Sequence, residues 1–339
     1  MNTVQNNFNL LPLNSFHIDY IARWFCCVET VDELHWLLSD KQFENQQQLI
    51  LGGGSNILFT KDFDGLVIKN ELQGIEKINE TDAHIFVKAA AGVVWHQLVQ
   101  YCISNNWAGV ENLSLIPGCV GASPIQNIGA YGVELKDVFY SLEAFSIHEK
   151  KLLTLHLNDC EFGYRDSVFK RQLKNQLVIT SVTFKLNKQP VFKTSYGAIE
   201  QELEKMKVHE LSIKAISQAV VNIRSSKLPN PAVLGNAGSF FKNPEIDADK
   251  FEQLKTDFPT IAAYPLANGN YKLAAGWLIE ECGWKGKTIG NCGVHQHQAL
   301  VLVNYGGATG AEIFDLSTKI VESVQHQFGV RLEREVNIL

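Results

Sequence analysis

The stretch Ile116-Pro-Gly-Cys-Val-Gly-Ala-Ser-Pro-Ile-Gln-Asn-Ile-Gly-Ala-Tyr-Gly132 contains four glycines and two prolines but no charged residue. Gly and Pro interrupt it too often for a helix, and it is too apolar for a solvated loop. Buried irregular backbone must find partners for its N–H and C=O groups, and a bound ligand often supplies them. Glycine also lets the backbone approach a cofactor closely. Taken alone, the stretch fits a cofactor-binding loop and a tight crossing between two elements equally well.

A second glycine-rich segment, Leu49-Ile-Leu-Gly-Gly-Gly-Ser-Asn-Ile-Leu-Phe59, predicts a strand, a loop and another strand. A Rossmann dinucleotide fingerprint is excluded, because Ile57 stands where the third glycine of that pattern should be. The segment instead favours a nest of backbone N–H groups around an anion such as a pyrophosphate, with Ser55 and Asn56 as side-chain donors. A glycine-rich β-turn explains the run almost as well.

Composition limits the classes of function. A chain of 339 residues has room for more than one domain, and 45% hydrophobic with 19% charged residues is ordinary for a soluble globular protein. The formal net charge of −6 argues against nucleic-acid and anionic-membrane partners, while a local basic pocket for a phosphorylated small molecule stays compatible with it. No apolar run approaches the roughly 20 residues of a membrane span, and the N-terminus lacks signal-peptide features. We expect a cytoplasmic protein without membrane insertion.

Cysteine and histidine patterns give no metal site. The cysteines are seven, an odd number without ligand spacing, which favours free thiols over disulfides or zinc. His295 and His297 would project from one face of a strand, but no third ligand lies nearby in the sequence. A structural or substrate-contact role is therefore favoured for this pair.

Hydrophobic periodicity predicts an α+β protein. Apolar spacing and capping residues predict helices over residues 31–39, 95–105, 211–226, 273–282 and 310–328. Strands are predicted at residues 66–69, 85–89, 142–145, 177–186, 299–304 and 330–338. The breaker Leu228-Pro-Asn-Pro-Ala232 follows the third helix, and we place a domain boundary near it.

Five motifs in this order resemble the UDP-N-acetylenolpyruvoylglucosamine reductase family over nearly the whole chain: Gly52–Asn56, Ile116–Gly132, Tyr164–Lys170, Gly235–Pro244 and Leu332–Val336. The resemblance implies a FAD-binding fold of the p-cresol methylhydroxylase type with a separate α+β substrate-binding domain. It also implies non-covalent FAD, NADPH as the hydride-donating co-substrate and a UDP-sugar enolpyruvate as substrate. The implied reaction forms UDP-N-acetylmuramate for peptidoglycan, and so serves cell wall biogenesis, cell shape and cell division.

The resemblance also implies a domain organisation. Residues 1–226 would form the FAD-binding region from two α+β subdomains, 227–325 the substrate-binding domain, and 326–339 a terminal strand returning to the active site. The segment near 187–210 resembles the tyrosine-bearing insertion of the type I subgroup, so Tyr196 is expected to close over the substrate. Ser15 and His17 depart from the family pattern. This departure does not affect the expected fold, and only the contact made by their own loop is left undetermined.

Three residues are expected to be catalytic by this resemblance. Arg165 would meet the carboxylate on which negative charge develops, since guanidinium offers it a planar fork. From the sequence around it alone, a salt bridge to Asp166 or another carboxylate is the simpler interpretation. Ser239 would donate a proton, although a serine after glycine is usually a turn or cap residue. Glu335 would help Arg165 polarise the enol carboxylate, although the polar face of a terminal strand is usually just solvated.

The remaining site residues also come from the resemblance. The residues expected to bind the cofactor are Gly52, Gly53, Gly54, Ser55, Asn56, Pro117, Gly118, Gly121, Ala122, Ile125, Ile179 and Arg224. Those expected to bind the substrate are Tyr131, Tyr196, Lys227, Asn243, Tyr264, Lys285 and Gln298. Two of these, Lys227 and Lys285, carry the charge that a diphosphate requires, although each alone could be a surface lysine.

Two other classes compete with this interpretation. One is another FAD-dependent oxidoreductase of the same fold, such as a sugar or alcohol oxidase, which predicts a His or Cys for covalent flavin attachment in the glycine loop. Residues 49–59 contain neither. The other is a non-enzymatic nucleotide-binding protein, in which Arg165, Ser239 and Glu335 would be unrelated. The sequence does not determine the oligomeric state, and a monomer is our expectation.

Overall fold

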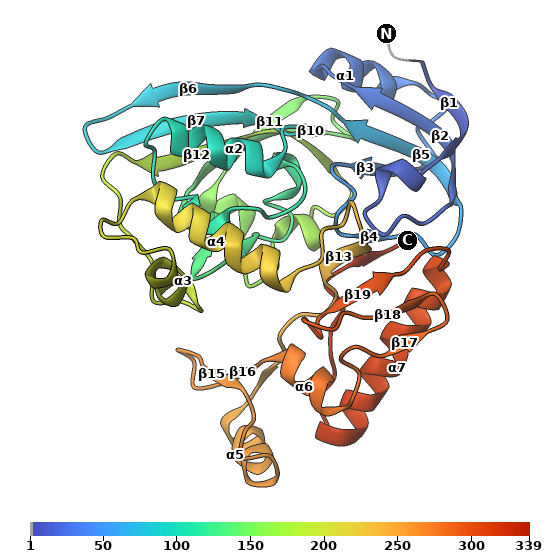
Figure 1. Cartoon of the computed structure of the whole chain (residues 1–339). Helices are drawn as coiled ribbons and strands as arrows, with labels where there is room; N and C mark the ends of the chain where they lie inside the picture. Colours follow the sequence, from blue (N-terminus) through green and yellow to red (C-terminus); the bar gives the residue numbers. More distant parts are fainter. Residues whose placement is uncertain (1–2) are drawn as a thin grey trace. The chain divides into compact units, whose positions relative to one another are not determined.

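The computed structural model describes residues 3–339, and the chain divides into two compact units (Figure 1). Unit 1 comprises the segment that ends at Phe8 together with Ile21–Gly54 and Phe63–Ser226. Unit 2 comprises Asn9–Tyr20, Ser55–Asp62 and Lys227–Leu339. The range 1–226, expected to form one region, is therefore interrupted, since two short segments before the breaker fold with the C-terminal unit. Their apolar residues Phe16, Ile18 and Leu58 are buried in the core of unit 2.

The N-terminal part of unit 1 contains a four-stranded sheet in the order β1-β2-β5-β3. Its strands are β1 (Gln5–Asn9), β2 (Ile21–Val28), β3 (Gln47–Leu51) and β5 (Phe63–Asn70), and β5 pairs in parallel with both β2 and β3. Helix α1 (Val31–Ser39) has the predicted bounds and begins at Thr30, whose side chain accepts a hydrogen bond from the Glu33 N–H. Strands β1 and β2 were not predicted.

The second part of unit 1 is an antiparallel sheet in the order β11-β10-β12-β7-β6. Its strands are β6 (Ile75–Glu80), β7 (His84–Ala90), β10 (Phe139–Ser146), β11 (Leu152–His156) and β12 (Leu177–Asn187). A short hairpin joins β8 (Gly129–Ala130) to β9 (Val133–Glu134). The helices are α2 (Trp95–Ser104), α3 (Ile199–Lys205) and α4 (Ile213–Lys227). Strand β12 is buried along most of its length, as expected for a central strand, and the strands predicted in this region are confirmed.

Unit 2 contains a four-stranded sheet in the order β13-β19-β18-β17, a three-stranded sheet in the order β14-β16-β15, and the parallel pair β4 and β20. The strands are β4 (Ile57–Leu58), β13 (Gly235–Ser239), β14 (Glu245–Ile246), β15 (Ala263–Pro265), β16 (Tyr271–Leu273), β17 (Thr288–Ile289), β18 (Cys292–Val294), β19 (Val301–Asn304) and β20 (Asn337–Ile338). The helices are α5 (Ala248–Asp257), α6 (Ala275–Glu281) and α7 (Gly310–Phe328).

Helix α7 supplies much of the core of unit 2. It has the predicted bounds, with a capping box between Thr309 and Glu312 at its start and Gly329 in the left-handed region at its end. A Cβ on Gly310 would lie 1.7 Å from the carbonyl oxygen of Phe59, so only glycine fits where the start of α7 approaches residues 55–62. This contact fixes the 55–62 segment of unit 2 against the helix.

The strand predicted over residues 330–338 is regular only at β20, so its predicted length was wrong. Val330, Leu332 and Val336 are buried as the alternation predicted. The alternation is interrupted at Arg334, whose guanidinium donates to the hydroxyls of Ser317 and Thr318 on α7 at 2.8 and 2.7 Å. The segment is therefore an irregular extended chain held against a helix.

Three absences hold for the described residues 3–339. None of their helices is long and apolar enough to cross a membrane. They contain no group of three or more His, Cys, Asp or Glu side chains that could hold a metal ion. None of their cysteines forms a disulfide, and the free thiols are Cys26, Cys27, Cys102, Cys119, Cys160, Cys282 and Cys292.

Candidate active site

The two glycine-rich segments lie against each other in unit 1. A Cβ added to Gly53 would lie 2.9 Å from the Cα of Gly118, and one added to Gly52 would lie 3.6 Å from the Cβ of Cys119. Gly54 and Gly118 also have φ angles of +62° and +107°, which favour glycine. Two main chains are therefore packed directly against each other here, with no side chain between them.

Much of the backbone of residues 116–132 is satisfied by the protein itself. The carbonyl of Gly118 accepts from the Trp95 N–H at 3.0 Å, and the Gly121 N–H donates to Ala91 at 2.9 Å. A Cβ on Gly121 would lie only 2.5 Å from that of Ala91. The stretch is thus a tight crossing over the connection between β7 and α2, and the same crossing brings Pro117 and Gly118 to the glycine run.

Other residues expected at the cofactor hold this crossing in place. The carbonyl of Ile125 accepts from the Ser167 hydroxyl at 2.6 Å, and the carbonyl of Ile179 accepts from the side-chain amide of Asn70 at 3.0 Å. Ala122 is exposed beside them, whereas the Ile179 side chain is buried in the core. Ile179 therefore supports the region from inside the sheet.

Arg224 on α4 provides an unsatisfied positive group in unit 1. Its Nε is buried and has no hydrogen-bond partner among the described residues. Burial lowers the pKa of its guanidinium, the phenol of Tyr131 raises it, and the charge of Arg165 lowers it further. A buried N–H without an acceptor is costly, and an anionic ligand would remove that cost. The unpartnered N–H of Arg224 is therefore suited to an anionic group such as a diphosphate.

Arg165 lies in a tight turn of unit 1 and has a φ angle of +51°. Its Nη2 donates to the carbonyl of Gly129 at 2.6 Å. The neighbouring Asp166 forms an ion pair with Arg171. Asp166 is therefore engaged by Arg171, and the Arg165 guanidinium reaches the main chain of β8.

Tyr131 and Tyr196 meet in unit 1, as two expected substrate residues. A Cβ on Gly132 would lie 3.3 Å from the Cβ of Tyr196, and one on Gly197 would lie 3.6 Å from the Tyr131 ring. Asn112 ties the two segments together, since its side-chain amide donates to the carbonyls of Tyr131 and Lys193 at 2.9 and 2.8 Å. Tyr196 itself remains 54% exposed, so its ring is available to a ligand.

Ser239 follows a β-bulge at the end of β13 in unit 2. Asn236 pairs with Val303 and Ser239 with Val301, so β13 has one extra residue between them. Gly238 absorbs this residue at φ +69°, and its N–H donates to the side-chain oxygen of Asn236 at 2.9 Å. A bulge of this kind turns a side chain out of the regular alternation of a strand.

Glu335 is held beside the bulge within unit 2. Its N–H donates to the carbonyl of Phe240, the residue after Ser239, at 2.8 Å. Its own carbonyl accepts from the side-chain amide of Asn56 at 3.3 Å. The structure therefore brings together Ser239, Glu335 and Asn56, which the sequence placed in three separate motifs. Ser55, adjacent to Asn56, belongs to the same unit.

Two more predicted residues meet at the start of α6. The side-chain oxygen of Asn243 accepts from the Ala275 N–H at 3.0 Å, and the side-chain oxygen of Gln298 lies 3.3 Å from the position of a Cβ on Gly276. Gln298 also accepts from the Leu300 N–H at 3.3 Å, and the Leu300 carbonyl accepts from Phe240. A short chain of bonds therefore connects Gln298 to the Ser239 bulge.

The other substrate candidates of unit 2 are more exposed. Lys285 pairs with Glu280 at 2.7 Å, Tyr264 is 52% exposed on β15, and Lys227 is exposed at the end of α4. Within residues 3–339, no contact joins the side chains of Lys285, Tyr264 and Lys227 to one another. Their assignment continues to rest on the family resemblance.

Several supporting residues were missed at the sequence level. Asn236 stabilises the bulge and Asn112 ties Tyr131 to the insertion, while His96 accepts a hydrogen bond from the Leu115 N–H at 3.0 Å. Each acts on main-chain groups, which every residue carries, so spacing gives no signal for them. Asn236 lies inside the motif Gly235–Pro244, and its position before Ala237 and Gly238 was the only feature of the sequence that could have indicated it.

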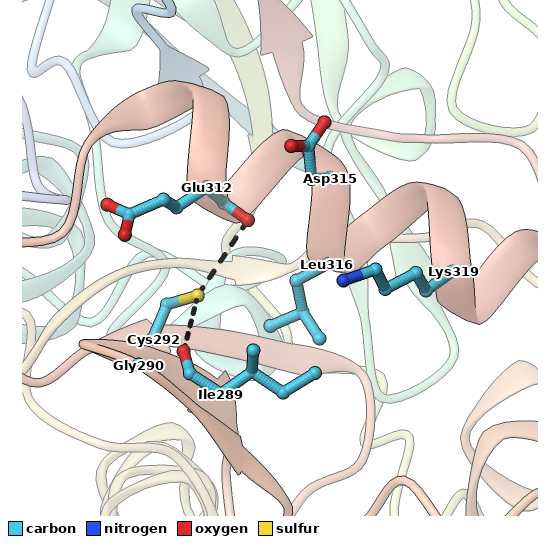
Figure 2. Close-up of a pocket in the computed structure, with 7 residues that line it drawn as sticks. All are labelled: Ile289, Gly290, Cys292, Glu312, Asp315, Leu316 and Lys319. Atoms are coloured by element: carbon cyan, nitrogen blue, oxygen red, sulfur yellow. Dashed lines mark hydrogen bonds between the residues drawn. The ribbon is translucent and has the colours of Figure 1, made fainter.

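Two surface cavities are lined by residues that were not predicted for the site. One of about 440 Å³ in unit 1 is lined by Glu29, Glu71 and Gln73. The other, of about 120 Å³, lies in unit 2 and includes Cys292, whose thiol donates to the carbonyls of Ile289 and Glu312 (Figure 2). Burial raises the pKa of this thiol, so it stays protonated and acts as a structural donor.

His295 and His297 lie after β18, and their rings are 5.5 Å apart. The His295 Nδ1 accepts from the His297 N–H at 3.4 Å. Burial and the neighbouring imidazole lower the pKa of His295. The pair therefore forms a local turn beyond the strand on which it was expected.

Comparisons with known proteins agree with this division of the site. Residues 22–148 match the family model of an FAD binding domain, and residues 230–339 match that of the C-terminal domain of UDP-N-acetylenolpyruvoylglucosamine reductase. The crystal structure of UDP-N-acetylenolpyruvylglucosamine reductase from Thermus caldophilus aligns with a TM-score of 0.68 at 22% sequence identity. The alignment covers 100% of this chain and 98% of that one. This likeness shows the fold.

Curated relatives extend the match over both units. The UDP-N-acetylenolpyruvoylglucosamine reductase of Flavobacterium johnsoniae is 48% identical, with 99% of each chain covered. That of Amoebophilus asiaticus is 54% identical over 336 residues, again with 99% of each chain covered. At this identity and coverage the chain belongs to the UDP-N-acetylenolpyruvoylglucosamine reductase family.

Proposed function

We propose that this enzyme, a UDP-N-acetylmuramate dehydrogenase, uses NADPH and non-covalently bound FAD to reduce UDP-N-acetyl-3-O-(1-carboxyvinyl)-glucosamine to UDP-N-acetylmuramate. One observation carries the proposal: Ser239 follows the Gly238 bulge while the Glu335 main chain bonds to the next residue, Phe240. The main-chain bond places the segment of Glu335 beside that of Ser239, and the two segments would supply a carboxylate and a hydroxyl. The names of the relatives supply the substrate, and such a protein would act in the cytoplasm in cell wall synthesis.

The residues that would hold FAD are those of the two glycine segments and Arg224. Bound FAD supplies hydride chemistry, taking a hydride from NADPH and passing it to the terminal carbon of the enolpyruvyl group. The main-chain N–H groups of the glycine segments would serve as donors to a diphosphate, and the buried Nε of Arg224 offers a charged donor.

Non-covalent attachment is supported by the state of the nearest thiol. Cys119 lies on the second glycine segment, with its Sγ 3.9 Å from the position of a Cβ on Gly52. Burial raises the pKa of this thiol, so it is protonated and a poor nucleophile at neutral pH. A cysteine is thus close to the glycine loop, but its protonated thiol is poorly suited to the covalent flavin link of an oxidase.

Arg165 would stabilise the carboxylate of the enolpyruvyl group. Hydride addition to the terminal carbon moves negative charge onto that carboxylate, which becomes an enediolate. Preorganised donors aimed at such charge lower the barrier, because they need no reorganisation during the reaction. The 2.6 Å bond from Nη2 to Gly129 fixes the guanidinium before substrate binds.

Ser239 would donate the proton to the carbon next to the carboxylate. A hydroxyl is a weak acid, but the enediolate carbon is strongly basic, and reprotonation of the alkoxide from solvent completes the turnover. Glu335 would interact with the enol carboxylate together with Arg165. The product has gained one hydride and one proton, and one NADPH is oxidised to NADP⁺.

The residues proposed for the nucleotide part of the substrate rest on the family resemblance. Tyr131 and Tyr196 are the candidates from unit 1, with Tyr196 closing over the substrate. Those from unit 2 are Lys227, Asn243, Tyr264, Lys285 and Gln298. The lysines would meet the diphosphate, and the 2.7 Å pair between Lys285 and Glu280 would have to open or reorient for this contact.

Absorption spectra test the proposal most directly. The purified protein should be yellow, NADPH should bleach the flavin band, and the UDP-sugar enolpyruvate should restore it. Acid or heat should release intact FAD into solution. Bleaching by NADPH that molecular oxygen reverses but the enolpyruvate does not would favour an oxidase, and a colourless protein that binds UDP-sugars would favour a binding protein.

A further inference from the structure

His96 occupies the second position of α2 and makes a hydrogen bond to remote main chain. Its Nδ1 accepts from the N–H of Leu115 at 3.0 Å. Leu115 has a φ angle of +59°, in the left-handed region that is strained for an L-residue. The preceding Ser114 is fully buried and bonds to Ser217 on α4 at 2.8 Å. The strained residue is thus fixed on one side by Ser114 and on the other by the imidazole.

The direction of this bond defines the state of the imidazole. A nitrogen that accepts an N–H carries no proton, so the ring is neutral with its proton on Nε2. Imidazolium has two donors and no acceptor, and it would oppose the Leu115 N–H with another N–H. Neutrality of His96 is therefore a condition of this contact.

The surroundings of His96 favour the neutral state. Burial lowers the pKa of the imidazole most, and the positive charge of Arg224 on α4 lowers it further. The first turn of α2 contains no acidic residue. Beyond Arg224 lie the phenol of Tyr131 and the guanidinium of Arg165, which act on Arg224 itself. None of these groups supplies an anion that would stabilise imidazolium.

We propose that His96 is a positioning residue for the flavin loop: its Nδ1 holds Leu115 in the left-handed conformation, and so sets the path by which residues 116–132 enter the crossing at Gly118. Leu115 lies immediately before this stretch, and Gly118 three residues later contacts Gly53. An error in the backbone at Leu115 would move Pro117 and Gly118 relative to the glycine run. The inference rests on the proposed function in assigning this loop to FAD.

Two substitutions of His96 test the roles of its two ring nitrogens one at a time. In His96→Asn the side-chain oxygen can take the place of Nδ1 and accept from Leu115, and the residue no longer titrates. In His96→Gln the polar end reaches the place of Nε2 and the acceptor near Leu115 is lost. His209→Leu, at an exposed position of the same unit, serves as the control.

The experiment measures the FAD affinity of the stripped protein at pH 7.5 and pH 5.5 by quenching of flavin fluorescence. At pH 7.5 we expect His96→Asn and His209→Leu to bind within about threefold of the parent, and His96→Gln to bind on the order of 10- to 100-fold more weakly, the value of one lost buried hydrogen bond. Parental affinity in His96→Gln would overturn the inference. So would loss of affinity in His96→Asn equal to that in His96→Gln.

The pH dependence provides an independent test that does not need His96→Gln to fold. Because the pKa of His96 is lowered in the folded protein, its contribution to stability is complete above the ordinary imidazole value of about 6.5 and is lost as the pH falls through the lowered pKa. The parent should therefore lose both FAD affinity and thermal stability toward pH 5.5 more steeply than His96→Asn. Equal acid sensitivity of these two proteins would overturn the inference.

Failure of the proposed function would look different. A parent protein that binds no FAD would contradict the flavin assignment, while the difference in acid stability between the parent and His96→Asn would still report on Leu115. Conversely, normal flavin binding in every His96 variant would leave the proposed function intact and remove His96 from the loop.

Discussion

The side-chain amide of Asn56 donates a 3.3 Å hydrogen bond to the main-chain carbonyl of Glu335, a residue 279 positions later in the chain. Asn337 strengthens the same junction, since its N–H and its side-chain amide both donate to the Asn56 carbonyl, at 3.1 and 2.9 Å. The end of the glycine segment and the end of the chain therefore form one structure within unit 2. A residue expected at the cofactor thus helps to position a residue expected in catalysis.

The contact between Gly53 and Gly118 predicts different effects for two adjacent glycines. Gly53→Ala should weaken FAD binding and destabilise the protein, because its Cβ would lie 2.9 Å from backbone that cannot move aside as a side chain would. The cost should be about 1–3 kcal/mol, as for other overpacking substitutions. Thermal unfolding and flavin titration measure the two effects.

Gly52→Ala is the matched control, because its Cβ would be in ordinary contact at 3.6 Å with the Cβ of Cys119. It should retain flavin binding within a few-fold. Equal effects of the two substitutions would show that the glycines matter through flexibility rather than through close approach. A Gly54→Asp change should abolish binding altogether, since it adds a carboxylate at a left-handed position facing the diphosphate.

The bulge before Ser239 predicts a role for Asn236 in both stability and activity. Its side chain donates to the carbonyls of Pro229 and Leu234 at 3.2 and 2.8 Å and accepts from the Gly238 N–H. Asn236→Ala leaves these groups unpaired and should destabilise the protein by about 1–3 kcal/mol. Activity should fall with it, because Ser239 loses its fixed direction.

Asn268→Ala provides the comparison, since this exposed side chain donates to the exposed carboxylate of Glu245 at 2.8 Å and accepts from the N–H of Asn270 at 3.1 Å, both at the surface where water can replace them. Surface changes of this kind stay within about 0.5 kcal/mol. Urea denaturation of both variants and the parent measures the difference. A variant Asn236→Ala as stable as Asn268→Ala would mean that the bulge is maintained by Gly238 alone.

Elements with a periodic sequence pattern could be predicted, whereas features that depend on a single contact could not. Helices α1 and α7 were predicted to the residue because their apolar spacing and capping residues agree with each other. Strand β2 was missed, since three consecutive residues in it, Trp24 to Cys26, are buried and its alternation is broken. In the antiparallel sheet of unit 1, β7, β10 and β12 were recognised because each alternates or is largely apolar, whereas β6 and β11 were not predicted.

The functional residues follow the same division. Motif residues such as Ser239 could be named from the sequence, but the bulge that directs Ser239 could not, because one extra residue in a strand has no periodic sign. His96 and Asn236 were also not predictable, since each bonds to main-chain groups that every residue carries. The association of segments 9–20 and 55–62 with unit 2 depends on long-range packing that no local pattern encodes.

Tyr196 is expected to affect the substrate more than the flavin. Its side chain is 54% exposed, and its backbone neighbour Gly197 packs on Tyr131. Tyr196→Phe and Tyr196→Ala should leave reduction of the flavin by NADPH largely intact and weaken the UDP-sugar, by about 1 kcal/mol for a neutral hydrogen bond and up to about 3 kcal/mol for one to phosphate. Stopped-flow reduction and substrate titration measure these separately, and unaltered substrate affinity in the Ala variant would remove Tyr196 from the site.

The proposed role of Ser239 separates two half-reactions that share one flavin. Ser239→Ala should still be reduced by NADPH, because that step needs no proton from this hydroxyl. Reoxidation by the enolpyruvyl substrate should become very slow, at or above the top of the range of about 10²–10⁴-fold for general acid catalysis, because an unprotonated enediolate must otherwise wait for solvent. Ser239→Cys should recover part of the rate, since thiol is the better acid. Rapid mixing of the reduced enzyme with substrate measures reoxidation directly. A rate in Ser239→Ala within a few-fold of the parent would exclude Ser239 as the proton donor and transfer that role to Glu335, whose main chain bonds to the residue after Ser239, or to a bound water.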